Sequence, residues 1–203
     1  MEYCWLVAQR YNILYRLGIT PWEHEEAPEQ LKSITEGVTP AGRALDLGCG
    51  TGSDAVHLAE HGWTVTAVDG VEQALSKARA RAQSRGVEVN WVQGDVCSLE
   101  QLDIGDAFTL VLDRGCFHDF TDDQRDRYAR GVSAVTDPGA MLLMFAFQPR
   151  RRGLGPRGVT ADELMRHFGQ DWELLSSSPD IELKLPRWFG DIRPRWHRLR
   201  HRL

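Results

Sequence analysis

Three alternating glycines carry the clearest chemical signal in this sequence. Gly48, Gly50 and Gly52 stand in "LDLGCGTGSD", directly after a short apolar run that contains Asp46. Glycine lets the backbone approach a ligand closely, and in an open α/β sheet such a loop lies beyond the carboxyl ends of the strands, where ligands bind. The stretch therefore predicts a binding loop for a nucleotide-type ligand.

The spacing of the glycines separates two cofactor classes. A dinucleotide site requires G-x-G-x-x-G or A, but the residue three positions after Gly50 is Ser53, so that pattern fails. S-adenosylmethionine carries no phosphate, and its loop only passes under a ribose and an amino-acid tail. Asp46 can hold the ammonium group of that tail, directly or through water. The spacing favours S-adenosylmethionine.

Two further carboxylates follow the next two predicted strands. Asp69 ends "TVTAVD", where it can bind the ribose hydroxyls, and Asp95 in "VQGDV" can reach the adenine amino group with Val96 beside the ring. A single aspartate of this kind would more simply cap a loop, but their recurrence in consecutive strand–helix units predicts one cofactor site. We expect Cys49 and Gly70, in the same loops, to contact the cofactor as well.

Alternating strands and helices must position these residues. The pattern predicts strands at 43–48, 63–69, 87–93, 108–113 and 139–147, and helices at 53–62, 71–86, 121–135 and 160–169. Such alternation indicates a Rossmann-like, doubly wound, mostly parallel sheet with helices on both faces. Strand-like segments at 172–177, 181–185 and 195–203 have no helix between them, which predicts a C-terminal antiparallel hairpin at the sheet edge.

The length of 203 residues and the lack of repeats indicate one domain, 1–203. Within it we expect an N-terminal helical cover at 1–40, a cofactor-binding core at 41–148, and a C-terminal helix with antiparallel strands at 149–203.

The cover begins with a predicted helix at 3–17. Tyr15 and Trp22 are predicted to close over the sulfonium and the acceptor, because an aromatic face attracts positive charge. Tyr11 is better explained by core packing.

Composition limits the classes of partner. A net charge of −5 argues against a general nucleic-acid binder, and the arginines gathered around 150–157 and 193–202 are typical of a solvated basic edge. Four scattered cysteines indicate reduced thiols, and no apolar run is long enough for a signal peptide or a membrane span. We expect a cytoplasmic monomer or homodimer without a metal, because the histidines are also scattered.

These motifs resemble the class I S-adenosylmethionine-dependent methyltransferases over nearly the whole chain. More narrowly, "LVLDRGCFHDF", "DRYA", "GPRGVTADELMRHFG" and "YRLGITPWE" are similar to the thiopurine, thiol and halide branch of small-molecule methyltransferases. The resemblance implies methyl transfer to O, S or N of a small aromatic, heterocyclic or thiol acceptor. It adds Asp113 to the expected cofactor contacts, and it makes Arg114 either a partner for an anionic acceptor or a structural ion pair.

The loop "DRGCFHDF" must face the acceptor if methyl transfer takes place. Transfer from a sulfonium needs mainly proximity and alignment, and a base is needed only when the acceptor is protonated. His118 and Asp119 are the adjacent base-like pair of this loop and are the candidate catalytic residues, although such a pair also commonly caps a helix. The expected substrate contacts are Tyr15, Trp22, Arg114, Cys116 and Phe117.

Two alternatives remain open from the sequence. A non-catalytic S-adenosylmethionine-binding sensor or partner subunit would keep the same cofactor residues. An RNA or protein methyltransferase is less favoured, because "DRGC" stands where an N-P-P-Y-type tetrapeptide would follow the fourth strand.

Overall fold

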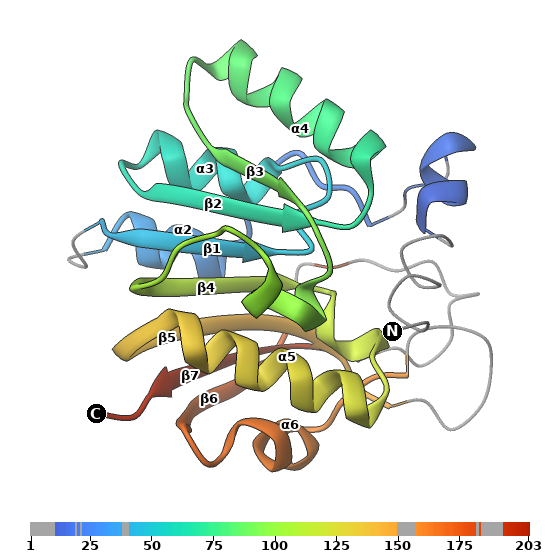
Figure 1. Ribbon diagram of the computed structural model, residues 1–203. Coiled ribbons are helices and arrows are strands. Elements are labelled where there is room, and N and C mark those ends of the chain that lie inside the picture. Colours follow the sequence, from blue (N-terminus) through green and yellow to red (C-terminus); the bar gives the residue numbers. More distant parts are fainter. Residues whose placement is uncertain are drawn as a thin grey trace.

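A seven-stranded sheet, in the order β3-β2-β1-β4-β5-β7-β6, forms the centre of the described part of the chain (Figure 1). This computed structural model describes residues 11–18, 20, 22–37, 41–149, 157–181, 183 and 193–203. The strands are β1 (Arg43–Leu47), β2 (Thr64–Asp69), β3 (Asn90–Gln93), β4 (Phe108–Arg114), β5 (Thr136–Phe147), β6 (Trp172–Pro179) and β7 (Pro194–His201). β1 to β5 run parallel, and β7 runs antiparallel to both β5 and β6. The predicted fold class is confirmed.

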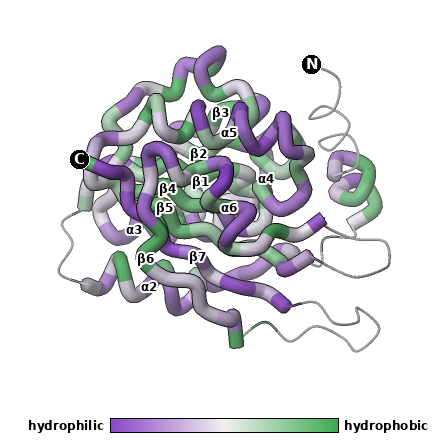
Figure 2. The backbone as a smooth tube through the Cα atoms, turned by 90° about the horizontal axis from the view of Figure 1, so that it is seen from below, coloured by the Kyte–Doolittle hydropathy of each residue, from purple (hydrophilic) through white to green (hydrophobic). Residues whose placement is uncertain are grey.

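Helices cover both faces of the sheet. One face carries α2 (Glu29–Thr35) and α3 (Ser53–Glu60), with α4 (Glu72–Arg85) packed beside α3. The other face carries η1 (Val96–Gln101), α5 (Asp122–Val135) and α6 (Ala161–Phe168). Leu110 and Leu112 of β4 pack toward the first face and Val111 toward the second, so hydrophobic residues concentrate along the central strands (Figure 2).

The C-terminal strands form the predicted antiparallel pair at the sheet edge. The strand after β6 that joins the sheet is β7, which lies between β5 and β6. The predicted strand at 181–185 lies largely outside the described residues, as do Gly155, Pro156 and residues 150–152.

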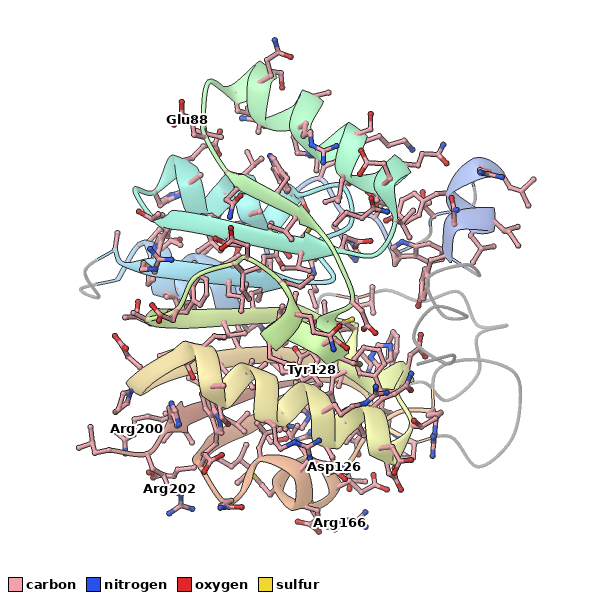
Figure 3. All side chains as sticks on the ribbon, in the orientation of Figure 1. Glu88, Asp126, Tyr128, Arg166, Arg200 and Arg202 are labelled. Atoms are coloured by element: carbon pink, nitrogen blue, oxygen red, sulfur yellow. The ribbon has the colours of Figure 1, made fainter. Side chains whose placement is uncertain are left out.

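The arginines of β7 bond to the chain's own acceptors. Arg195 donates to Ser177, and Arg200 forms an exposed ion pair with Glu173 at 3.0 Å. Arg200 and Arg202 lie at the edge away from the carboxyl ends of the parallel strands (Figure 3). This arrangement agrees with a solvated basic edge.

Two predicted boundaries differ for physical reasons. The third strand starts at Asn90 and not at 87, because Gly86 adopts a φ of 68° and the Val87 N–H donates to Ala82 O, which closes the end of α4. β5 begins at Thr136, earlier than the predicted 139, because Thr136 pairs with Phe108 before an irregularity in the register. Residues 11–16 form a helix beyond the carboxyl ends of β1 and β2 (Figure 1), and the earlier part of the predicted helix lies outside the described residues.

Candidate functional site

The glycine loop, residues 48–52, joins β1 to α3. Gly48, Gly50 and Gly52 adopt φ values of 72°, 53° and 75°. A Cβ on Gly50 would lie 3.1 Å from Tyr15 Oη, and a Cβ on Gly52 would lie 2.5 Å from the Trp91 ring. Gly52 therefore requires glycine both for its left-handed backbone and for space, and Gly50 requires it for its left-handed backbone.

Asp69, the last residue of β2, holds the glycine loop from the neighbouring strand. Its Oδ2 accepts from the Gly50 N–H and its Oδ1 accepts from the Val71 N–H, both at 2.8 Å. Burial raises the pKa of Asp69, and these two donors oppose the rise. Asp69 thus lies at the loop as the sequence predicts, and its contact with a ribose stays a prediction.

Asp46 is a buried carboxylate with an unpartnered oxygen. Its side chain lies in β1, the residue is 3% exposed, and Oδ2 has no hydrogen-bond partner. Burial raises the pKa of Asp46 well above its ordinary value, and neighbouring carboxylates, Asp54 foremost, raise it further. A cation beside Asp46 would relieve both the missing hydrogen bond and the like-charge repulsion. The site therefore fits the ammonium group of S-adenosylmethionine.

Asp95 begins η1 after β3. Its Oδ1 accepts from the Cys97 N–H at 2.8 Å and caps that helix, so the simple capping function is present. Val96 is 7% exposed and packs in the core, and Gly70 is exposed in the turn after Asp69. The adenine contacts of Asp95 and Val96 stay predictions.

Asp113, at the end of β4, is saturated by donors of the protein itself. Oδ1 accepts from the N–H groups of Gly115 and Cys116, and Oδ2 accepts from the Phe117 N–H and the Tyr128 hydroxyl, at 2.8–3.1 Å. Tyr128 belongs to α5, where Figure 3 labels it. Burial raises the pKa of Asp113 to about 6 against these donors. A carboxylate offers about four acceptor positions, so these donors make Asp113 a residue that fixes the loop, and its predicted cofactor contact stays a prediction.

Arg114 forms an ion pair with Asp54, in the first turn of α3. Its Nη1 lies 3.0 Å from Oδ1 and 3.1 Å from Oδ2, and the two side chains are 19% and 8% exposed. Of the two interpretations that the sequence leaves open for Arg114, the structural ion pair is the one that the structure contains.

The cover places aromatic rings against the glycine loop. Trp22 lies edge-on to Tyr11 and Tyr15, with ring centroids 5.0 and 5.9 Å away. Trp22 Nε1 donates to Tyr15 Oη at 3.3 Å, and that hydroxyl donates to Glu23 at 2.5 Å. Burial first and Glu23 second raise the pKa of Tyr15 far above that of an ordinary phenol. Tyr15 and Trp22 therefore lie together, with Tyr15 beside the glycine loop, and their closure over the sulfonium and the acceptor stays a prediction.

Tyr11 links the cover to the loop after β4. Its hydroxyl donates to Asp119 Oδ2 at 2.8 Å, so its contacts extend beyond core packing. His118 is 3% exposed, its Nδ1 accepts from the Phe147 N–H at 3.4 Å, and burial lowers its pKa to about 4. His118 is therefore neutral and a weak proton acceptor near pH 7, and Asp119 is the member of the pair that meets the cover.

The other predicted contacts divide between the core and the loops. Phe117 has no exposed surface, and the centroid of its ring lies 5.3 Å from that of Tyr128. It therefore builds the core and not a substrate surface. Cys116 is half-buried, and its Sγ lies 3.0 Å from where a Cβ on Gly48 would stand. Cys49 is half-buried in the glycine loop itself.

Several residues of the site were not among the predictions, including Glu23, Thr51, Asp54, Arg125 and Tyr128. Glu23 stands in the acidic run "WEHEE", which is typical of a solvated segment, and Asp54 stands in the first turn of a helix, where an acidic residue is common. Arg125 is buried and donates to Gly158 O at 2.6 Å and to His118 O at 3.4 Å. Only long-range packing identifies Arg125 and Tyr128, because each looks like an ordinary helix residue in the sequence.

The described part of the chain has neither a metal-ligand cluster nor a membrane-spanning helix. In that part of the chain, no group of three or more His, Cys, Asp or Glu side chains is arranged to hold a metal ion. No helix there combines the length and the apolar character that crossing a bilayer requires.

Comparison with known proteins agrees with these features. A family model described as a methyltransferase domain matches residues 44–139. The chain is similar to the 2-heptyl-1-hydroxyquinolin-4(1H)-one methyltransferase of Mycobacteroides abscessus, with 31% identity over 166 residues, covering 78% of this chain and 71% of that protein. It is also similar to the thiopurine S-methyltransferase of Azotobacter vinelandii, with 29% identity over 163 residues, covering 72% and 74% of the two chains.

The fold has solved counterparts. The crystal structure of the Burkholderia thailandensis 1,6-didemethyltoxoflavin-N1-methyltransferase, with 1,6-didemethyltoxoflavin and S-adenosylhomocysteine bound, covers 100% of this chain with a TM-score of 0.78. The match covers 90% of that chain at 24% identity.

Proposed function

The chain belongs to the class I S-adenosylmethionine-dependent methyltransferases, and from this premise we propose that it methylates an O, S or N atom of a small aromatic, heterocyclic or thiol acceptor. When bound, S-adenosylmethionine supplies a methyl group on a sulfonium, which is already activated for in-line displacement.

On the cofactor side, the chain's own residues would bind and orient S-adenosylmethionine. Asp46 would pair its unpartnered oxygen with the ammonium group, and Asp69 would offer its remaining acceptor positions to the ribose. The left-handed glycines keep side chains out of the space beside the loop. Asp95, with one oxygen engaged in capping, would reach the adenine with the other.

On the acceptor side, Asp119 would take the proton of a neutral acceptor. Its Oδ2 accepts the Tyr11 hydroxyl, which keeps this carboxylate turned toward the cover. An acceptor that is already a thiolate or an ionised phenol would need no base, and positioning alone supplies roughly 7–11 kcal/mol in favourable cases. His118 would contribute packing, because burial lowers its pKa to about 4.

The contact between Tyr11 and Asp119 is the observation that carries the acceptor class. A cover that touches the loop after β4 encloses the reacting atoms, which favours a small acceptor over a macromolecule. The aromatic rings of Tyr11 and Trp22, 5.0 Å apart, favour a flat ring as the acceptor. Two relatives named for a hydroxyquinolinone and for thiopurines support the same chemical class.

An acceptor screen tests the proposal. The protein is incubated with S-adenosylmethionine and sets of hydroxyquinolines, thiopurines, simple thiols, phenols and quinones, and release of S-adenosylhomocysteine is measured with mass spectrometry of the product. We expect turnover on at least one heteroaromatic hydroxyl or thiol. Binding of S-adenosylhomocysteine without turnover on any acceptor would indicate a sensor or partner subunit, and turnover only on RNA or protein would overturn the acceptor class.

A further inference from the structure

Glu23 connects the cover to the glycine loop through both of its carboxylate oxygens. Oε1 accepts from the Tyr15 hydroxyl at 2.5 Å, and Oε2 accepts from the Thr51 hydroxyl. A Cβ on Gly50 would lie 3.2 Å from Glu23 Oε1, so the carboxylate rests directly on the loop. Glu23, Tyr15 and Thr51 are called the latch below.

Both hydroxyls of the latch are buried and braced from α4. Tyr15 is 4% exposed and Thr51 is 7% exposed. Lys77 Nζ lies 5.7 Å from the centroid of the Tyr15 ring, and Arg81 Nε donates to Thr51 O at 3.1 Å. Both donors thus belong to residues that α4 also contacts, and hydrogen bonds to a charged acceptor are the strong kind.

Glu23 itself is half-buried and remains open to solvent. Together with Thr51 it lines an open hollow of about 600 Å³ between the cover and α4. Water can therefore replace Tyr15 and Thr51 as partners of the carboxylate when the latch opens. The latch is thus a contact that can form and break without leaving a charge buried.

We propose that Glu23 is a positioning residue that fastens the cover over the bound cofactor and so sets how slowly S-adenosylmethionine and its product leave. Trp22 is included in this closure, because its Nε1 donates to the same Tyr15 hydroxyl that Glu23 accepts. The inference rests on the proposed function, since it requires that the glycine loop hold this cofactor. The control of cofactor residence would then lie in a residue of the cover, and not in Asp46 or Asp69 alone.

Dissociation of S-adenosylhomocysteine, measured by surface plasmon resonance, tests the latch. Glu23→Gln keeps the size of the side chain but removes its charge, and we expect the dissociation rate to rise about ten-fold while the association rate stays within about two-fold. Thr51→Val should give a similar rise, and Thr51→Ser, which keeps the hydroxyl, should restore slow release. Glu25→Gln is the matched control, because Glu25 is exposed and lines the same hollow.

The outcomes separate the latch from the proposed function. If the wild-type protein does not bind S-adenosylhomocysteine, the proposed function fails. If it binds and Asp69→Ala weakens binding, but Glu23→Gln releases the ligand at the wild-type rate, the latch alone is overturned. Faster association with unchanged dissociation in Glu23→Gln would also overturn it, because Glu23 would then obstruct entry. A coupling of the Glu23→Gln and Tyr15→Phe effects in a double-mutant cycle, at an unchanged melting temperature, supports it.

Discussion

The proposed donor half and the proposed acceptor half of this site differ in the long-range contacts that hold them together. The donor half is the glycine loop with Asp46 and Asp69, and the acceptor half is the cover with the loop at 115–119. In the donor half, a backbone N–H of Gly50 bonds Asp69, 19 positions away on the neighbouring strand. In the acceptor half, the Tyr11 hydroxyl bonds Asp119, 108 positions away.

This difference separates what the fold requires from what a particular acceptor requires. Backbone donors and left-handed glycines belong to the crossover from strand to helix, so few substitutions preserve the donor half. Side chain-to-side chain bonds in the acceptor half can be exchanged without changing the sheet. The acceptor half is therefore where a chain of this fold can change its substrate.

The strongest test changes the acceptor half alone. In Asp119→Asn, the Tyr11 hydroxyl can still donate to the amide oxygen, but the side chain can no longer take a proton. We expect kcat/KM to fall about 100-fold or more on a neutral hydroxyl acceptor and to change little on a thiol of the same ring. Steady-state kinetics on such an acceptor pair check it, and equal losses on both would remove the base from the mechanism.

The next test changes the donor half alone. Asp69→Ala removes a charged acceptor from the Gly50 and Val71 N–H groups and from the expected ribose. The affinity for S-adenosylhomocysteine, measured by calorimetry, should fall about 10- to 100-fold. Asp119→Asn serves as the control and should leave this affinity unchanged. A near wild-type affinity in Asp69→Ala would contradict the ribose contact.

The pH dependence of binding sharpens the comparison further. Burial raises the pKa of Asp46, whereas an ammonium group beside it stabilises the ionised form. Binding should therefore release a proton below this raised pKa, and affinity should fall by up to about ten-fold per pH unit as the pH decreases there. Calorimetry in buffers of different ionisation enthalpy detects the proton. Asp46→Asn should abolish the slope, and a slope that survives in this variant would assign it to another group.

The smallest effect is expected at the boundary between the halves. Tyr128→Phe removes one of the four donors to Asp113 and leaves the ring packed in the core. The free energy of unfolding in urea should fall by about 1 kcal/mol, with cofactor affinity unchanged. A fall in cofactor affinity would show that the two halves are coupled through the loop at 115–119.

The sequence predicts where the residues of the proposed donor half lie, because their spacing reflects local backbone geometry. A strand, a glycine turn and a helix place Gly48, Gly50 and Asp69 at the carboxyl ends of neighbouring strands, and this placement does not depend on contacts with distant parts of the chain. The sequence also predicts an antiparallel hairpin at the sheet edge, but not that β7 pairs with β5, because that pairing depends on packing of the whole sheet.

The sequence does not predict the side-chain contacts of the proposed acceptor half, because many of these contacts join residues that lie far apart in the chain. Glu23 belongs to an acidic run, and only its contacts with Tyr15 and Thr51 distinguish it from its neighbours. Phe117 stands in the acceptor loop but turns into the core, because the four donors to Asp113 bend the chain there. Spacing gives the place of such side chains along the chain but not their direction.

The position of β7 has a consequence for the order of assembly. β6 is joined to the rest of the sheet through β7, which is synthesised after it and pairs antiparallel with β5. During translation, β6 therefore emerges before the strand that connects it to the sheet. The parallel strands that carry the glycine loop can pair earlier. The nascent chain should therefore form the proposed donor half before β7 and β6 join the sheet.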